Sequence, residues 1–251
     1  METTLQPRAT AGRRRAARER LFYGAMTVAI LASVIVGFSP TYYLLDSFAR
    51  VTPLVHVHAA VFSAWVLLLL TQVALIAAAR VDLHRRLGIA GVALTPLLLV
   101  VGAATTIAVA QRISGAPHFA PPGRAMVALV NLIAFGVAAG VGFVKRRNAQ
   151  AHKRLLLVAT INLNIAAVNR LPLPQFLDST AGRFAVADLL LLPLIAWDVA
   201  TRGRPHPMTL LGVAITVANE GLQLLLRDSA AWNDLSRWII SAGFAASAFL
   251  R

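Results

Sequence analysis

Long apolar runs separated by short basic connections constrain this chain more than any other feature. Uncharged stretches of roughly 20 residues, the length that a helix needs to cross a bilayer, recur between Leu21 and Leu226. The composition agrees, because 58% of the 251 residues are hydrophobic and only 14% are charged, whereas soluble domains carry about 25% charged residues. The sequence therefore predicts an all-α membrane protein.

The lengths of the apolar runs predict a bundle of seven transmembrane helices. These helices are Leu21–Phe38, Leu54–Ala79, Ile89–Ala110, Ala125–Val144, Leu155–Val168, Phe184–Ala200 and Met208–Leu226. The fifth is the shortest, because Arg154 and Arg170 bracket only 15 residues. Residues 21–226 thus form the predicted transmembrane domain. We expect residues 1–20 to be a disordered basic tail and residues 227–251 an amphipathic or half-inserted segment, with a short eighth span as the alternative.

Positive charges are distributed unequally between the two sides of the predicted bundle. The segment before Leu21 and the connections on its side hold 16 Lys and Arg residues, against 7 in the opposite connections and the C-terminal segment as far as Arg237. Cytoplasmic loops of inner-membrane proteins are enriched in Lys and Arg. We therefore expect a cytoplasmic N-terminus and a multi-pass protein of a bacterial-type inner, or plasma, membrane.

Charge and composition also exclude several functions. The net charge of +14 suggests nucleic-acid binding at first sight. However, the cations lie in short clusters between apolar runs, as in cytoplasmic loops, so no nucleic-acid partner is predicted. The chain has no cysteine, which removes thiolate metal sites and iron–sulfur clusters. Lys145 and Lys153 are the only lysines and share one basic loop, so no lysine is available at membrane depth for a retinal Schiff base.

Polar residues gather at one depth of the predicted bundle. In the second span His58, Trp65 and Gln72 follow one helical face at intervals of seven residues. Side chains at a comparable depth in other spans are Asn131, Asn169, Arg170, Asp188, Glu220 and Gln223. Intramembrane ionisable groups are candidates for function, so we predict an outward-facing polar chamber that takes a small polar ligand or a proton.

Two ion pairs are expected inside this chamber, Arg170 with Asp188 and His58 with Glu220. The alternative interpretation is structural, because polar side chains also hold membrane helices together through hydrogen bonds. Separate substitutions of the two acids distinguish the interpretations, since a structural network predicts loss of folding and a site predicts folded but inactive variants.

Two basic strings each open a predicted helix on the cytoplasmic side. They are His84-Arg85-Arg86 and His152-Lys153-Arg154. Cations at a helix N-terminus oppose the helix dipole unless an anion lies between them, and free backbone N–H groups beside arginines bind anions. The sequence therefore predicts contacts with the phosphates of anionic lipid headgroups at these strings.

These strings also carry a resemblance. The run from Arg80 to Gly88, after a span that begins with His56 and His58, resembles uncharacterised bacterial multi-pass integral membrane proteins. The run from Arg146 to Arg154 is similar in the same way, and the likeness covers Leu54–Arg170. It implies a membrane fold and no established activity.

Three classes of function remain open from the sequence. The first is a transporter-like or sensor-like protein with no cofactor, whose catalytic residues, if any, are unknown. The second is a b-type haem electron carrier, resembling the two-haem plan of b561-type cytochromes. Its ligands would be His58, His84, His118 and His152. The third is a metal-dependent membrane hydrolase. Its ligands would be His56 and His58 with Glu220 or Asp188.

Overall fold

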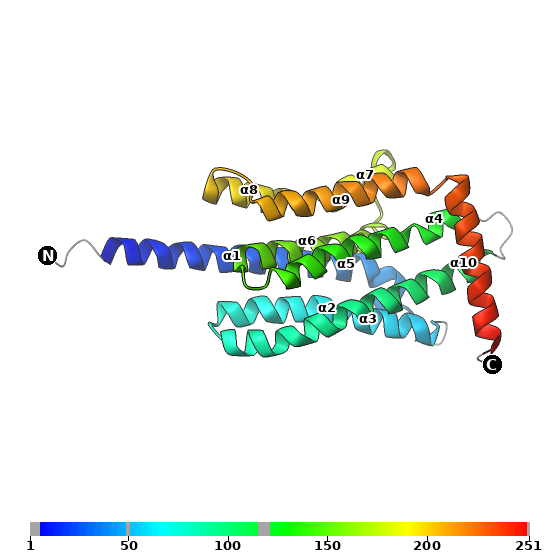
Figure 1. The fold of residues 1–251 in the computed structure, drawn as a ribbon, viewed down its shortest axis with the longest axis horizontal. Coiled ribbons are helices and arrows are strands. Elements are labelled where there is room, and N and C mark those ends of the chain that lie inside the picture. Colours follow the sequence, from blue (N-terminus) through cyan, green and yellow to red (C-terminus); the bar gives the residue numbers. More distant parts are fainter. Residues whose placement is uncertain (1–5, 49–50, 115–120, 250–251) are drawn as a thin grey trace.

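The computed structural model describes residues 6–48, 51–114 and 121–249, and every regular element within these ranges is helical. The long helices run along one axis, and the last helix lies across one end of them (Figure 1). In chain order the elements are α1 (Gln6–Phe38), η1 (Ser39–Tyr43), α2 (Pro53–Ala77), α3 (Val81–Ser114), α4 (Pro122–Met126), α5 (Ala128–Val144), α6 (Ala149–Val168), η3 (Gln175–Leu177), α7 (Thr180–Asp188), α8 (Leu191–Arg202), α9 (Pro207–Leu226) and α10 (Ala230–Phe249).

Six segments of the described chain are long and apolar enough to cross a membrane. They are Gly12–Tyr43, Pro53–Ala77, Val81–Ile113, Pro122–Val144, Thr180–Arg202 and Pro207–Leu226. The sixth predicted span corresponds to α7 and α8 together, and the fourth to α4 and α5. The predicted all-α membrane bundle is confirmed, with α6 as a further helix that runs among these six segments.

α6 is enclosed by its neighbours, which agrees with its absence from the six segments that are apolar enough to cross a membrane. Of its 20 residues 13 are buried, among them Arg154, Asn162 and Asn164. It packs against α1, α5, α7 and α9. A helix surrounded by protein satisfies its polar groups within the bundle, whereas a helix facing lipid has no such partners. The predicted fifth span was therefore weak in hydropathy for a structural reason.

The bundle has two distinct ends. The basic end carries the connections between α2 and α3, between α5 and α6 and between α8 and α9, and α1 extends beyond it (Figure 1). At this end Asn148 caps α6 by accepting hydrogen bonds from Gln150 N and Ala151 N, both at 3.1 Å. Gly203 ends α8 with a φ of 75°, in the left-handed region that glycine adopts without strain.

The basic segment before Leu21 differs from the expected disordered tail. From Gln6 onward it is the first part of α1, while residues 1–5 lie outside the described residues. Its cations reach the C-terminal ends of neighbouring helices, where backbone carbonyls attract positive charge. Arg15 donates to the carbonyl of Thr201 at 3.4 Å and Arg20 to that of Ala77 at 3.3 Å. The segment is thus continuous with the apolar part of α1, and these two contacts attach it to α8 and α2.

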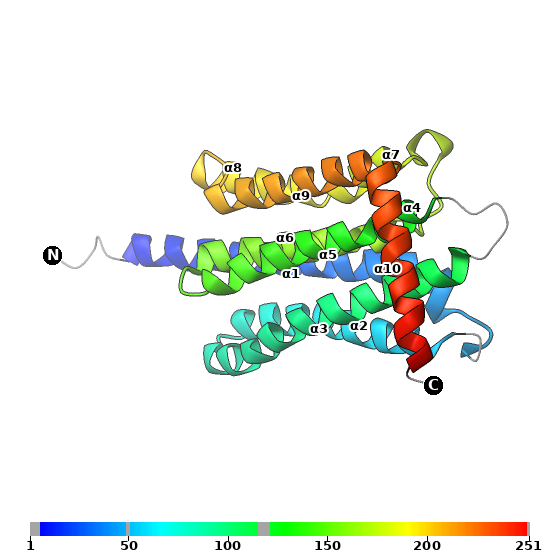
Figure 2. The ribbon, with the colours of Figure 1, turned by 45° about the vertical axis from the view of Figure 1, so that its right-hand side comes forward.

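α10 lies across the end of the bundle opposite the basic end, which we call the α10 end (Figure 2). Its Trp232 Nε1 donates to the carbonyl of Gly123 at 2.9 Å, and Gly123 N donates to Asn233 Oδ1 at 2.9 Å. A Cβ atom at Gly123 would lie 2.7 Å from the Trp232 ring, so only glycine permits this contact. α10 is absent from the segments apolar enough to cross a membrane within the described chain.

Candidate functional site

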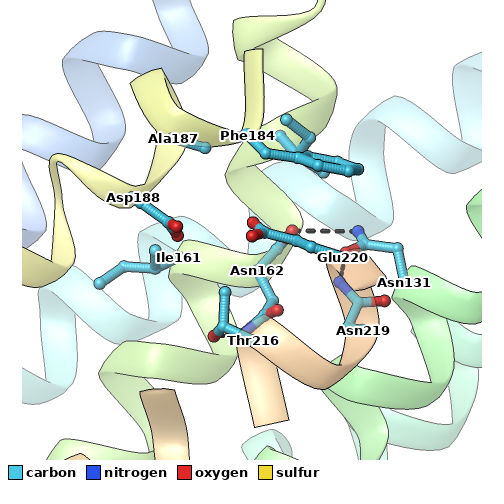
Figure 3. Close-up of a pocket in the computed structure, with 10 residues that line it drawn as sticks. Asn131, Ile161, Asn162, Phe184, Ala187, Asp188, Thr216, Asn219 and Glu220 are labelled. Atoms are coloured by element: carbon cyan, nitrogen blue, oxygen red, sulfur yellow. Dashed lines mark hydrogen bonds between the residues drawn. The ribbon is translucent and has the colours of Figure 1, made fainter. Parts of the chain in front are cut away.

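Two carboxyl groups face each other between α7 and α9. Asp188 is the last residue of α7, and Glu220 lies on α9. The two carboxyl groups point toward one another across one pocket (Figure 3). Two ionised carboxylates facing each other at such a place would repel each other, whereas a proton on one of them supplies a hydrogen-bond donor. Neither group belongs to an ion pair among the described residues.

The backbone breaks next to this pair. Helix α7 ends at Asp188, and α8 begins at Leu191 after a turn. Pro193 accounts for the break, because proline has no N–H to donate and its ring clashes with the carbonyl four residues earlier, that of Leu189. Interrupted helices at membrane depth provide unpaired backbone groups and helix ends, and transporters bind coupling ions at such places.

A chain of buried amide side chains runs beside the carboxyl pair. Gln223 Nε2 donates to Asn219 Oδ1 at 3.0 Å, and Asn219 Nδ2 donates to Asn131 Oδ1 at 3.1 Å. Asn131 Nδ2 donates to the backbone carbonyl of Asn162 at 3.0 Å. The side chain of Asn162 then donates to Thr216 Oγ1 at 3.0 Å. This chain joins α5, α6 and α9 around the site (Figure 3).

One acceptor of this network has no partner. Asn162 Oδ1 is buried without a hydrogen bond, and Asn162 lines the same pocket as Asp188 and Glu220. Buried polar atoms of native proteins are normally paired with protein or water. An unpaired acceptor beside two carboxyl groups therefore favours a donor in the pocket, such as water or a hydrated proton.

The pocket is small and lies toward the α10 end. Asp188 is eight residues from the start of the span Thr180–Arg202, and Glu220 is six residues from the end of Pro207–Leu226. At 1.5 Å per residue both lie about 9–12 Å from that end of their spans. The space between the side chains has room for about one water molecule. The described conformation therefore accommodates a proton or water there and leaves no room for an organic ligand.

Of the residues predicted to line a polar chamber, the structure brings together those from α5, α7 and α9. These are Asn131, Asp188, Glu220 and Gln223. The face of α2 lies elsewhere: Trp65 Nε1 donates to Thr160 Oγ1 of α6 at 3.1 Å, and His58 stacks on Phe62 with ring centroids 4.1 Å apart. Gln72 is further along α2, toward the basic end.

Neither expected ion pair is formed. Arg170 donates to the carbonyl of Ala166, and its guanidinium lies 4.3 Å from the centroid of the Phe38 ring. Asn169 is the exposed residue that ends α6. The expected partners of Arg170 and His58, which are Asp188 and Glu220, face each other instead, because α7 and α9 direct both carboxyl groups into the same pocket.

A second polar cluster is buried at the basic end. Arg154 of α6 and Asp198 of α8 form an ion pair in which the side chains are 1% and 0% exposed. Arg154 Nε lies 3.1 Å and 3.3 Å from the two carboxylate oxygens of Asp198. The same carboxylate accepts from His206 N at 3.0 Å and from Thr209 Oγ1 at 2.5 Å. This cluster fastens α6, α8 and the start of α9 together.

The basic strings, expected to bind lipid phosphates, are partly used within the protein. Arg154 is buried against Asp198, and Lys153 pairs with Glu19 of α1 and lies 4.8 Å from the Tyr23 ring centroid. Arg85 and Arg86 are exposed, which leaves them free to meet a headgroup as predicted. A buried arginine that is paired with a carboxylate cannot reach a lipid phosphate, so the expectation for Arg154 does not hold.

The histidines of the two strings meet at the basic end. The His84 and His152 ring centroids are 6.5 Å apart with an interplanar angle of 84°. At the other end His56 shares a hydrogen bond with Tyr42 Oη at 2.9 Å. His118, a predicted haem ligand, lies outside the described residues. No group of three or more His, Asp or Glu side chains within the described chain is arranged to hold a metal, so the ligand set expected for a hydrolase is not assembled there.

Several site residues were missed in the sequence. Asn162 and Thr216 complete the amide chain, and Asp198 is the partner of Arg154. Asp198 could have been found, because an acid within an apolar span requires a nearby cation. The fifth span begins beside Arg154, which is such a cation at the same end.

Known proteins give no further guide to this arrangement. Comparisons with protein-family models, with curated proteins and with solved structures find no match to this chain. The function is therefore inferred from the geometry of the site.

Proposed function

We propose that this chain is a proton-coupled, transporter-like membrane protein in which Asp188 and Glu220 bind and release the proton. The observation that carries the proposal is that the two carboxyl groups face each other across one small pocket (Figure 3), and that neither has an ion-pair partner among the described residues. A proton on one group allows that group to donate to the other, and removal of the proton leaves two like charges that repel each other in a poorly solvated place. Binding and loss of one proton thus changes the interaction between α7 and α9.

The surroundings favour a proton over a larger ligand. The pocket has room for about one water molecule, and the adjacent side chains of Asn131, Asn162 and Asn219 are neutral amides. Phe184 lies over the pocket (Figure 3). A small, neutral and partly apolar lining makes the charge state of the two carboxyl groups the main variable of the site.

The break between α7 and α8 gives the site a means of movement. Because Leu189 and Leu190 interrupt the helix directly after Asp188, α7 can tilt at this point without disrupting a continuous hydrogen-bond ladder. Repulsion between two ionised carboxyl groups would separate α7 from α9, and protonation would bring them together. Alternating access in transporters uses such rigid movements of half-helices.

We further propose that the basic end faces the cytoplasm of a plasma membrane. The excess of Lys and Arg at that end supports this orientation. The carboxyl pair then lies in the outer half of the membrane. A proton would enter from the outside and cross the tightly packed region between α6 and α9 only when the helices move.

Infrared difference spectroscopy tests proton binding directly, because a protonated carboxyl has a C=O stretch that its anion lacks. We expect the purified protein to show such a band, and Asp188→Asn and Glu220→Gln each to remove it. Asp234→Asn is the matched control, since Asp234 is exposed on α10 and pairs with Arg237. A spectrum without a protonated carboxyl band, or a band unchanged in both site variants, contradicts the proposal.

A further inference from the structure

Unpaired polar atoms mark a second place in the bundle, at the basic end. Both side-chain atoms of Gln72, Oε1 and Nε2, are buried without a partner, and so is Nδ1 of His84. These residues are neighbours, because a Cβ at Gly88, one helical turn after His84, would lie 3.9 Å from Gln72 Nε2. Unpaired buried polar atoms are rare in native proteins and indicate water or an ion.

His152 contributes a ring nitrogen to the same region. Its Nδ1 lies 2.9 Å from the carbonyl of Gly142. A carbonyl only accepts, so Nδ1 carries the hydrogen and Nε2 holds a free lone pair. Histidines that bind metals are oriented in this way, with the second ring nitrogen donating to a carbonyl or carboxylate.

The two imidazoles are close enough to share an ion. Their ring centroids are 6.5 Å apart. Two imidazoles bound to one Zn²⁺ at roughly 2.0–2.1 Å would have centroids about 5–6 Å apart, so a shift of about 1 Å, within side-chain rotation, completes the geometry. The Phe143 ring lies 6.0 Å from the His152 ring and forms one wall of this region.

We propose that His84 and His152, with Gln72 Oε1 as a third ligand, hold a divalent first-row transition-metal ion. Imidazole nitrogen suits zinc, copper, nickel and iron, while magnesium and calcium prefer carboxylate oxygen. The neighbouring basic side chains do not prevent this, because Lys153 and Arg154 are already paired with acids and Arg85 is exposed to solvent, which screens its charge. Haem iron is also bound by histidine imidazoles. The experiment therefore distinguishes a free metal ion from the iron of a bound haem.

Metal binding is measured on protein purified from cells supplied with zinc and haem. Elemental analysis and an absorption spectrum are recorded first, and Zn²⁺ binding to chelator-treated protein is then measured by equilibrium dialysis. We expect about one metal per chain, and His84→Ala or His152→Ala to weaken Zn²⁺ binding at least about tenfold. His56→Ala, at the other end of the bundle, is the control and should bind as the unaltered protein does.

The readouts distinguish the outcomes. A Soret band that disappears in both His84→Ala and His152→Ala identifies haem iron as the bound metal, while zinc without that band identifies the free ion. Gln72→Leu should weaken binding less than either histidine variant, since an amide oxygen is the weakest of the three ligands. Thermal unfolding without metal shows that each variant is folded. Equal Zn²⁺ binding by the double variant H84A/H152A and by the unaltered protein, with no haem in either, overturns the proposal.

Discussion

Arg154 of α6 and Asp198 of α8 form an ion pair almost closed to solvent, although 44 residues separate them in the sequence. Every oxygen of the Asp198 carboxylate is used, by Arg154 and by the groups that begin α9, His206 N and Thr209 Oγ1. The arginine is satisfied in turn, since its Nη1 donates to the Gln150 carbonyl at 2.9 Å. The pair is thus a fully hydrogen-bonded junction of three helices.

Removing one partner of this junction should destabilise the protein strongly. In Asp198→Asn the Arg154 charge stays buried without a counter-charge, and such losses are on the order of 3–5 kcal/mol in folding free energy. The double variant Arg154→Met with Asp198→Leu should be much closer to the unaltered protein, because both charges leave together. Thermal unfolding in detergent measures both. Similar losses in the single and the double variant would show that the charges themselves contribute little.

His206 makes the stability of the basic end depend on pH. Burial, and then the charge of Arg154, lowers the pKa of His206 below its ordinary value of 6.5. Its Nδ1 accepts from Met208 N at 3.0 Å and so caps α9, which only an unprotonated Nδ1 can do. The folded protein therefore favours the neutral ring. The resulting stability is complete above the ordinary pKa and is lost as the pH falls through the lowered, folded-state pKa.

Unfolding midpoints from pH 8 to pH 5 test this capping role. The unaltered protein should lose roughly 0.5–2 kcal/mol on acidification, the usual contribution of an N-cap. The variant His206→Asn keeps an acceptor for Met208 N and does not titrate, so its midpoint should fall less over the same range. Parallel curves for the two proteins would assign the pH dependence to other groups.

Much of the fold was predictable because one physical requirement controls it. Each lipid-facing span must be a long apolar helix, and the runs around Leu54–Ala79 and Ile89–Ala110 show this directly. The prediction was least secure for α6, where Asn162 and Asn164 lower the hydropathy. Their burial depends on which helices surround α6, and single-span hydropathy carries no such information.

The site was predictable in part, for a related reason. Depth along a helix follows from residue number, so the sequence predicts Asp188 and Glu220 at a similar level, and in the structure both line one pocket. The direction in which a residue faces depends on helix rotation and on neighbours. For that reason His58 and Arg170 were grouped with the acids, although α2 turns His58 toward Phe62 and the end of α6 holds Arg170 beside Phe38.

The two acids of the proposed proton site should tolerate neutral replacement in folding and fail in proton movement. Asparagine at 188 and glutamine at 220 keep the size of the acids and can donate and accept hydrogen bonds, so unfolding free energies should change by about 1 kcal/mol or less. Proteoliposomes with an internal pH dye and a potassium diffusion potential should show faster proton entry with the unaltered protein than with either variant. Loss of folding in both variants would instead support a purely structural network.

Membrane orientation can be tested because the chain contains no cysteine. Arg146, Arg204 and Asp178 are each replaced by cysteine in separate variants. Intact cells and inverted membrane vesicles are then treated with an impermeant maleimide, which labels only a cysteine on the outer surface of each preparation. Arg146 and Arg204 lie in connections at the basic end, and Asp178 lies in the connection after α6 at the other end. We expect the first two to react only in inverted vesicles and the third only in intact cells. Labelling of the first two from opposite sides would contradict the bundle itself.

Gly212 of α9 packs closely against Val158 of α6, and this contact lies between the two polar clusters. A Cβ at position 212 would lie 2.8 Å from Val158 Cγ2, so Gly212→Ala forces the two helices apart. Overpacking of this kind is destabilising by about 1–3 kcal/mol. Val158→Ala removes the clashing methyl groups, and the double variant should therefore regain much of the stability that Gly212→Ala loses. A double-mutant cycle of unfolding free energies measures this coupling, and additive losses would show that the two residues are not in contact.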